Sequence, residues 1–170
     1  MKVNVYDLTV PQTVRTLEGL KSSLKKAMTL CQTKKIDFSV LLQARLAPDQ
    51  FPLVKQVQVA TDNAKGAVGR LTNIPMPKFE DNESTYEQLI ARIDKTIAFL
   101  QTAKPEDFNG FEDKKIEFPW MPGKQLTGYN YLVQHMLPNY HFHLTTAYAI
   151  LRHNGVEIGK ADYLGQQSWQ

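Results

Sequence analysis

The sequence DQFPLVKQVQVATDNAKGAVGRL, residues 49–71, decides the fold of this protein. Its apolar residues recur at spacings of three and four, which predicts a helix with one buried face. Asp49 is the expected N-cap, and Pro52 falls in the first turn, where its missing N–H costs little. Small alanines on the buried face would let a neighbouring helix approach closely. The face consists of Leu53, Val57, Ala60, Ala64, Ala67 and Leu71.

Three further segments show helical periodicity, and they are residues 10–33, 84–103 and 129–154. Pro11 suits the first position of the first segment. Ser84 and Glu87 have the arrangement of a capping box at the start of the second. Gly155 suits a C-terminal cap after the third. Four long helices predict an all-α fold, a four-helix bundle, in which residues 1–170 form a single domain.

The connections between these helices differ in character. Residues 34–48 are expected to contain a short helix that packs down on the bundle. Residues 104–128 form a long irregular segment rich in proline and glycine, within which KKIEFPW and KQLTGY form either short strands or extended loops. A connection of this length is uncommon in a compact domain unless it covers something. The tail, residues 156–170, is expected to extend over the surface.

Composition narrows the classes of function. The 170 residues carry a net charge of +3, and their basic residues are scattered, which argues against a nucleic-acid partner. No apolar run approaches the roughly 18 residues of a membrane span, so we expect no membrane partner. The N-terminus lacks the pattern of a secretory signal, which favours a cytoplasmic location. The single cysteine, Cys31, excludes a disulfide within the chain, and we expect it to be a small buried residue.

All four histidines fall on or beside the last predicted helix. His135, Asn139 and His143 are four residues apart and share one side of it, whereas His141 points to a different side. His135 and His143 lie two turns apart, roughly 12 Å along the axis, which is too far to share one ion readily. The local pair is therefore Asn139 with His143. These two side chains either ligate a metal or satisfy their polar groups through hydrogen bonds.

Other residues bear on a pocket beside this pair. Pro138 removes a backbone hydrogen bond inside the helix, so we expect a kink and a freed carbonyl near Gln134, either facing a pocket or on the surface. Aromatic residues gather in the last third of the chain, where they suit a ligand pocket or a core. Asp62 is a candidate base or anchor, with an ion pair to Lys65 as the alternative.

Two segments carry a resemblance to a known family. They are LAPDQFPLVKQVQVATDNAKGAVGRL, residues 46–71, and PNYHFHLTTAYAILRHNGVEIGKADYLG, residues 138–165. Together they resemble a bacterial family of unknown function within the DinB/YfiT-like superfamily. The resemblance implies an up-down-down-up four-helix bundle, often a homodimer, with a long crossover between the second and third helices.

The resemblance also implies a metal site. Many superfamily members carry three histidines there, one on the second helix and two spaced by four on the last. Carried onto this chain, the site falls on Gln56, Asn139 and His143, of which only the last is a histidine. Carboxamides are poor ligands for zinc or nickel. The trio could instead hold a polar small molecule by hydrogen bonds.

Two functions follow from these observations. One is a small-molecule enzyme or binder that uses a polar cleft around Gln56, Asn139 and His143, between the second and fourth helices. If a divalent metal binds there, His143 ligates it and the metal activates water or a thiol, as in the thiol transferases and hydrolases of the superfamily. The alternative is a non-catalytic homodimeric bundle that acts through its surface in a stress response. The sequence names neither ligand nor cofactor, and it does not decide whether the protein is an enzyme.

Overall fold

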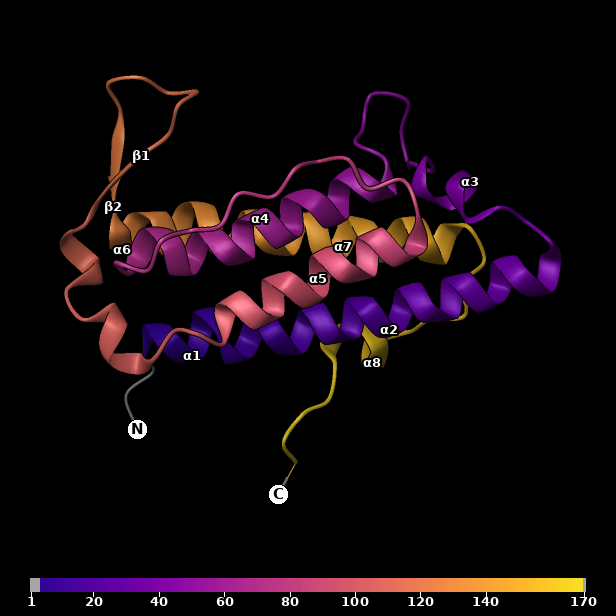
Figure 1. The fold of residues 1–170 in the computed structure, drawn as a ribbon, viewed down its shortest axis with the longest axis horizontal. Coiled ribbons are helices and arrows are strands. Elements are labelled where there is room, and N and C mark those ends of the chain that lie inside the picture. Colours follow the sequence, from indigo (N-terminus) through magenta and orange to yellow (C-terminus); the bar gives the residue numbers. More distant parts are fainter. Residues whose placement is uncertain (1–3, 170) are drawn as a thin grey trace.

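The computed structural model describes residues 4–169. Four long helices form a bundle: α2 (Pro11–Lys34), α4 (Leu53–Leu71), α5 (Tyr86–Leu100) and α7 (Leu137–His153). In Figure 1, α2 and α7 run from left to right, whereas α4 and α5 run from right to left. The crossover (residues 72–85) returns along the bundle to join the parallel helices α4 and α5. The predicted four-helix bundle, with its up-down-down-up order, is confirmed.

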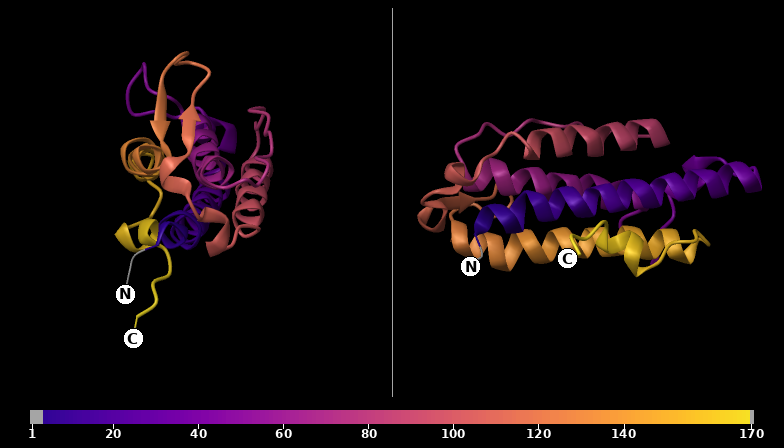
Figure 2. Two further views of the ribbon diagram at one scale, coloured as in Figure 1. Left: turned by 90° about the vertical axis from the view of Figure 1, so that its left-hand side faces the viewer. Right: turned by 90° about the horizontal axis from the view of Figure 1, so that it is seen from below.

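Shorter elements join and flank the long helices. They are α1 (Val5–Thr9), α3 (Phe38–Leu42), the 3₁₀ turns η1 (Pro105–Phe108) and η2 (Phe111–Asp113), β1 (Lys115–Glu117), β2 (Gln125–Thr127) and α8 (Lys160–Leu164). The strands β1 and β2 pair antiparallel, with Ile116 opposite Leu126, and together with the loop 118–124 they form the hairpin. Figure 2 shows that the hairpin projects from one end of the bundle. Of the two alternatives for the candidate segments between residues 104 and 128, short strands or extended loops, the structure therefore has short strands.

Two helix starts differ from the prediction. The α4 helix begins at Leu53 and not at Asp49, because Pro52 is still extended and the Leu53 N–H bonds back to the Ala44 carbonyl at 2.9 Å. The capping box of α5 lies one residue later than expected. The Gln88 side chain accepts hydrogen bonds from the backbone N–H groups of Thr85 and Ser84, and the Gln88 N–H donates to the Thr85 hydroxyl. These bonds stabilise the capping box at Thr85.

The last long helix is continuous from Gly128 to His153 but irregular in its first third. After α6 (Gly128–Asn130) comes a π-helical turn, η3 (Tyr131–Met136), and then α7. Pro138 has no N–H to donate to the carbonyl four residues earlier. The missing hydrogen bond falls next to the π-helical turn, in which the Leu137 N–H bonds to the carbonyl five residues earlier, that of Leu132. The disruption that Pro138 predicts thus appears as a π turn.

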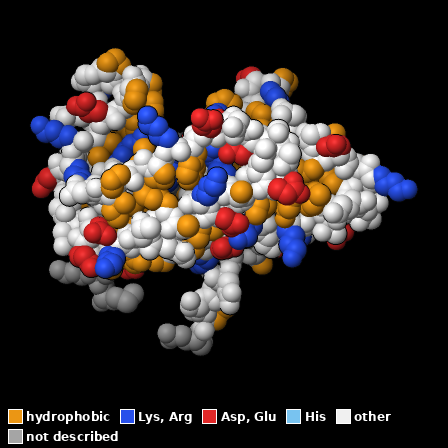
Figure 3. Space-filling view, viewed as in Figure 1, with side chains coloured by type: hydrophobic (Ala, Val, Ile, Leu, Met, Phe, Trp, Pro, Cys, Tyr) orange, Lys and Arg blue, Asp and Glu red, His pale blue; other side chains and the backbone are white. Residues whose placement is uncertain are grey.

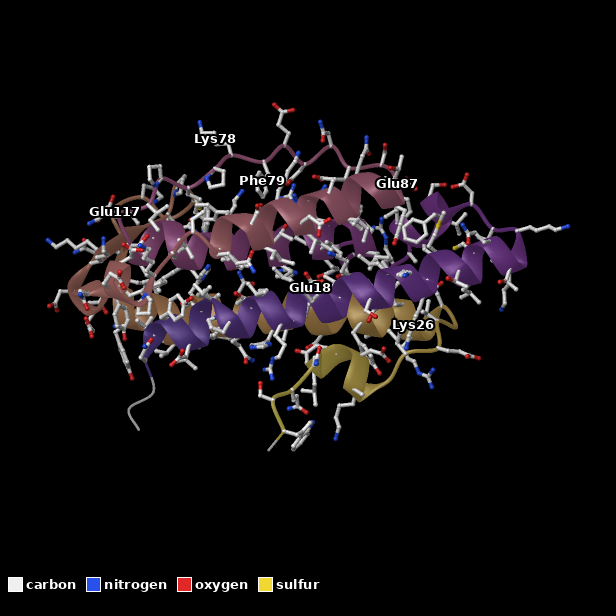
Figure 4. All side chains as sticks on the ribbon, turned by 60° about the horizontal axis from the view of Figure 1, so that its bottom comes forward. Glu18, Lys26, Lys78, Phe79, Glu87 and Glu117 are labelled. Carbon is white, nitrogen blue, oxygen red and sulfur yellow. The ribbon has the colours of Figure 1, made fainter. Side chains whose placement is uncertain are left out.

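The segment after α7 folds back onto the bundle, contrary to the extended tail that the sequence suggested. Gly155 ends α7 with a left-handed φ of 85°, and the amides of Gly155 and Val156 bond to carbonyls of the last turn. This reversal sends α8 against α2, close to Lys26 (Figure 4). Lys26 pairs there with Asp162 of α8 at 2.6 Å. Gly19 permits the close approach, since a Cβ there would collide with the Asp162 carbonyl.

The core follows the predicted stripes. The alanine-rich face of α4 is fully buried and packs against α7 more extensively than against any other element. Cys31 is buried, as expected for a small apolar residue. Within residues 4–169, no helix has both the length and the apolar character that a membrane span requires.

A buried arginine ties the crossover to the helices. The Arg92 side chain, on α5, is only 1% exposed. Its guanidinium pairs with Asp62 of α4 at 2.8 Å, with Asp81 of the crossover at 3.1 Å and with Glu83 of the crossover at 3.0 Å. Its Nε donates to the Thr61 hydroxyl at 2.7 Å. One side chain therefore holds three segments of the chain together.

An aromatic ring completes this junction. The Arg92 guanidinium lies 5.5 Å and the Lys65 ammonium 4.2 Å from the centre of the Phe79 ring. Figure 4 shows Phe79 turned from the crossover toward the helices, whereas Lys78 extends outward. Lys65 also pairs with Asp62 at 2.9 Å, which confirms the ion pair considered as an alternative from the sequence.

We predict that Arg92→Met lowers the free energy of unfolding by about 3–5 kcal/mol, because three carboxylates lose their shared partner. Lys21→Met is the matched control. It breaks the Lys21–Asp94 pair between α2 and α5, whose side chains are 33% and 50% exposed, and exposed pairs contribute about 0.2–1 kcal/mol. Urea unfolding of both variants at neutral pH measures the difference, and equal losses would contradict the role given to Arg92.

Candidate functional site

Polar residues interrupt the apolar contact between α4 and α7. We call Gln56, Asn63, Asn139 and His143 the polar seam. Because the two helices are antiparallel, ascending positions on α4 meet descending positions on α7. Gln56 accordingly contacts His143, and Asn63 contacts Asn139.

The pair formed by Gln56 and His143 has a defined polarity. The Gln56 carboxamide nitrogen donates to the Phe51 carbonyl at 2.9 Å, so its oxygen is the atom 2.7 Å from His143 Nδ1. A carboxamide oxygen only accepts, and Nδ1 must therefore carry the proton. Burial lowers the pKa of His143 below its ordinary value of 6.5, so the ring is neutral at pH 7. Its Nε2 then carries a lone pair.

Asn139 has a different partner from the one the sequence suggested. Its Nδ2 donates to Asn63 Oδ1 at 3.0 Å, and the Asn63 amide donates in turn to the Val59 carbonyl at 2.9 Å. The structure thus brings Gln56 and His143 together, as the resemblance implied. It places Asn139 one helical turn away, in a separate amide pair.

The chemistry of this trio does not fit a divalent cation. Both polar side-chain atoms of Gln56 form hydrogen bonds, and the Asn139 side-chain nitrogen donates a hydrogen bond to Asn63. His143 Nε2 alone remains as a nitrogen ligand, whereas zinc and nickel sites in proteins use several imidazoles or thiolates. Across residues 4–169, no three His, Cys, Asp or Glu side chains gather closely enough to hold a metal.

A cavity of about 370 Å³ opens beside Asn139. Four parts of the chain enclose it: α4, α7 with its π turn, the crossover and the hairpin. On the face drawn in Figure 3, the surface is hollowed beside the projecting hairpin, and Lys and Arg side chains are visible there. The cavity is lined by Val59, Asp62, Asn63, Lys65, Arg70, Met76, Phe118, Trp120, His135 and Asn139.

Aromatic rings form one wall of this cavity. The Phe118 ring lies 4.7 Å from the Trp120 ring and 4.7 Å from the His135 ring. His135 also stacks on Tyr131 at 5.7 Å. Burial, and secondarily the positive charge of Arg70, lowers the pKa of His135, so this ring too is neutral at pH 7. The aromatic residues of the last third therefore serve both as core and as pocket lining.

A larger hollow, about 650 Å³, lies between α2 and the segment around α8. It is lined by Arg15, Glu18, Gly19, Ser22, Ala161, Asp162, Gly165 and Gln166, among which there is no aromatic ring. Its two carboxylates, Glu18 and Asp162, are already paired with Lys21 and Lys26. We favour the smaller cavity because its polar and aromatic groups converge from several elements.

Comparison with known proteins shows the family of the chain and supports its fold. Residues 5–164 match the sequence profile of DUF1993, a domain of unknown function. The chain belongs to the DUF1993 family. A crystal structure of a DinB family member protein from Shewanella denitrificans is 46% identical and superposes with a TM-score of 0.93, covering 97% of this chain and 94% of that one. The expected DinB-like family of unknown function is confirmed, and no curated protein matches the chain.

Sequence reasoning missed two residues of this candidate site. Asn63 and Arg70 follow Gln56 at intervals of seven residues, so all three lie near one face of α4. That spacing places the three side chains near one face of the helix, but spacing alone does not show that this face borders a cavity. His141, by contrast, was correctly placed on another side, where its Nδ1 lies 3.2 Å from the Tyr163 hydroxyl of α8.

We predict that His143 carries its proton on Nδ1 at neutral pH and titrates below 6.5. Nitrogen-15 spectra of the imidazoles measure both properties. Gln56→Glu should raise the pKa, because a carboxylate stabilises the imidazolium, whereas the isosteric wild-type amide does not. A proton on Nε2 in the wild type would contradict the assignment.

A stability change accompanies these titrations. His135, His141 and His143 all have a pKa lowered by burial, so the unfolded chain binds protons more readily than the folded chain below pH 6.5. Their contribution to stability is therefore complete above that pH and is lost as the pH falls through the folded-state values. Urea unfolding at a series of pH values measures this loss, and unchanged stability over that range would argue against it.

Proposed function

We propose that this protein binds a small polar organic molecule in the cavity bounded by α4, α7, the crossover and the hairpin. The observation that carries the proposal is the convergence of polar groups from two helices and aromatic rings from the hairpin on one space of about 370 Å³. Ligand pockets in proteins have this mixture and volumes of roughly 300–1,000 Å³. The proposal concerns binding and assigns no reaction.

Hydrogen bonding, and not a metal, would orient the ligand. Asn139 Oδ1 has no hydrogen-bond partner within the described part of the chain, so it is available to a ligand N–H or O–H. The amide pair with Asn63 fixes the orientation of Asn139. One turn further along α7, the contact between Gln56 and His143 holds the two helices in register. Of the three expected cleft residues, Asn139 thus lines the cavity. Gln56 and His143 support it by holding α4 and α7 together.

The two tryptophans provide a test with a built-in control. Trp120 lines the cavity, whereas Trp169 lies in the C-terminal segment and is 84% exposed. In a screen of small polar fragments by nitrogen-15 NMR, we predict that binders shift the Trp120 indole signal and leave the Trp169 signal in place. Asn139→Leu should weaken these binders about 5- to 10-fold, the effect of one hydrogen bond.

Two outcomes would contradict the proposal. In one, no fragment shifts the Trp120 signal. In the other, the fragments that bind perturb only residues around the hollow between α2 and α8.

A second proposal is self-association through the last helix. Phe142, on α7, is a large apolar side chain that remains 56% exposed. Exposed apolar surface of this kind favours a protein partner. A second copy of the chain is the occupant that the resemblance implies.

We predict a dimer in analytical ultracentrifugation that Phe142→Glu converts to a monomer. Val40→Glu is the matched control, because Val40 is 60% exposed but lies on α3. A monomeric wild type, or a dimer unaffected by Phe142→Glu, would contradict an interface at this position.

A further inference from the structure

Arg70 differs from the other cationic groups that line the cavity. Lys65 is paired with Asp62, which is itself held by Arg92. Arg70, in the last turn of α4, has no carboxylate within salt-bridge distance in the described part of the chain. Glu117, on the neighbouring strand β1, is exposed and does not line the cavity. The cavity therefore contains one carboxylate and two cationic side chains, one of which is uncompensated.

Packing holds the Arg70 guanidinium at this place. It lies over the Phe118 ring at 5.4 Å and over the Tyr131 ring at 5.7 Å. Gly66 leaves the space for it, because a Cβ at that position would collide with Arg70 Nη1 and stand 3.0 Å from the Tyr131 hydroxyl. Aromatic faces attract the guanidinium without neutralising its charge.

Neither polar neighbour of Arg70 supplies a counter-ion. Tyr131 is 1% exposed, and its hydroxyl has no hydrogen-bond partner among residues 4–169. Burial raises its pKa, so the phenol stays protonated. His135 remains neutral at pH 7, because burial and the Arg70 charge lower its pKa. The aromatic and polar side chains named beside Arg70, which are Phe118, Tyr131 and His135, are thus all neutral, and the positive charge faces a partly enclosed space.

We propose that the cavity selects an aromatic carboxylate, whose carboxylate pairs with Arg70 and whose ring lies against Phe118 and Trp120. This inference rests on the proposed ligand-binding function and adds the ligand class. A guanidinium and a carboxylate form two parallel hydrogen bonds, which matches the planar shape of the ligand. Trp120 is 63% exposed and supplies apolar area that a ring would cover.

Benzoate and benzamide form a suitable probe pair, because they have nearly the same shape and differ in charge. Titrations followed by the Trp120 indole signal, with Trp169 as the internal reference, give both dissociation constants. We expect benzoate to bind the wild type about tenfold more tightly than benzamide or better, as for a hydrogen bond to a charged group. Benzoate should also raise the pKa of His135, because a bound anion stabilises the imidazolium.

Variants test whether Arg70 is responsible for the preference for benzoate over benzamide. Arg70→Gln should reduce benzoate affinity to that of benzamide and leave benzamide affinity unchanged, whereas Arg70→Lys should keep part of the preference. Arg152→Gln removes the same charge from the exposed end of α7 and should have no effect. Equal affinity of the wild type for the two probes would overturn the inference while leaving small-molecule binding intact.

Two further outcomes would also overturn it. In the first, neither probe binds, and the fragment screen then decides the proposed function separately. In the second, inorganic phosphate displaces benzoate at equal concentration, which would show that the site selects a compact anion without regard to the ring.

Discussion

The close packing of α4 against α7 is the constraint on which the rest of the structure depends. Small residues along α4 bring the two helices together and bury the polar seam between them. Buried carboxamides are tolerated only when they are hydrogen-bonded, and here each finds a partner across the interface or on its own backbone. The seam therefore fixes the register of the two helices. That register places Asn139 beside the cavity and His143 against Gln56.

Two arginines on adjacent helices illustrate how charge is used in this bundle. Arg92 is buried among three carboxylates and ties the crossover down. Arg70 sits on aromatic rings with no carboxylate beside it in the described chain, and it lines the cavity. An uncompensated guanidinium next to a partly enclosed space attracts anions more strongly than one in open water. The first arginine stabilises the fold, and the second gives the cavity its chemical preference.

Much of this fold could be predicted from the sequence, and the site only in part. Helical periodicity and capping residues located the four long helices, and the segments that became β1 and β2 were candidates for short strands, although their pairing was not predicted. The start at Asp49 and the extended tail were wrong, because the Ala44 carbonyl and the α2 surface supply contacts distant in sequence. Spacing placed Asn139 and His143 on one side of α7, but it could not show that Asn63 would take Asn139 as its partner. Arg70 was missed because its lack of a carboxylate is a property of three-dimensional packing.

A crystal structure of the protein with bound benzoate tests the central claim most directly. The account predicts ligand density in the cavity of α4, α7 and the hairpin, with the carboxylate within hydrogen-bonding distance of the Arg70 guanidinium and the ring against Trp120. Density with the ring in the cavity and the carboxylate turned away from Arg70, or density only in the hollow between α2 and α8, would contradict it.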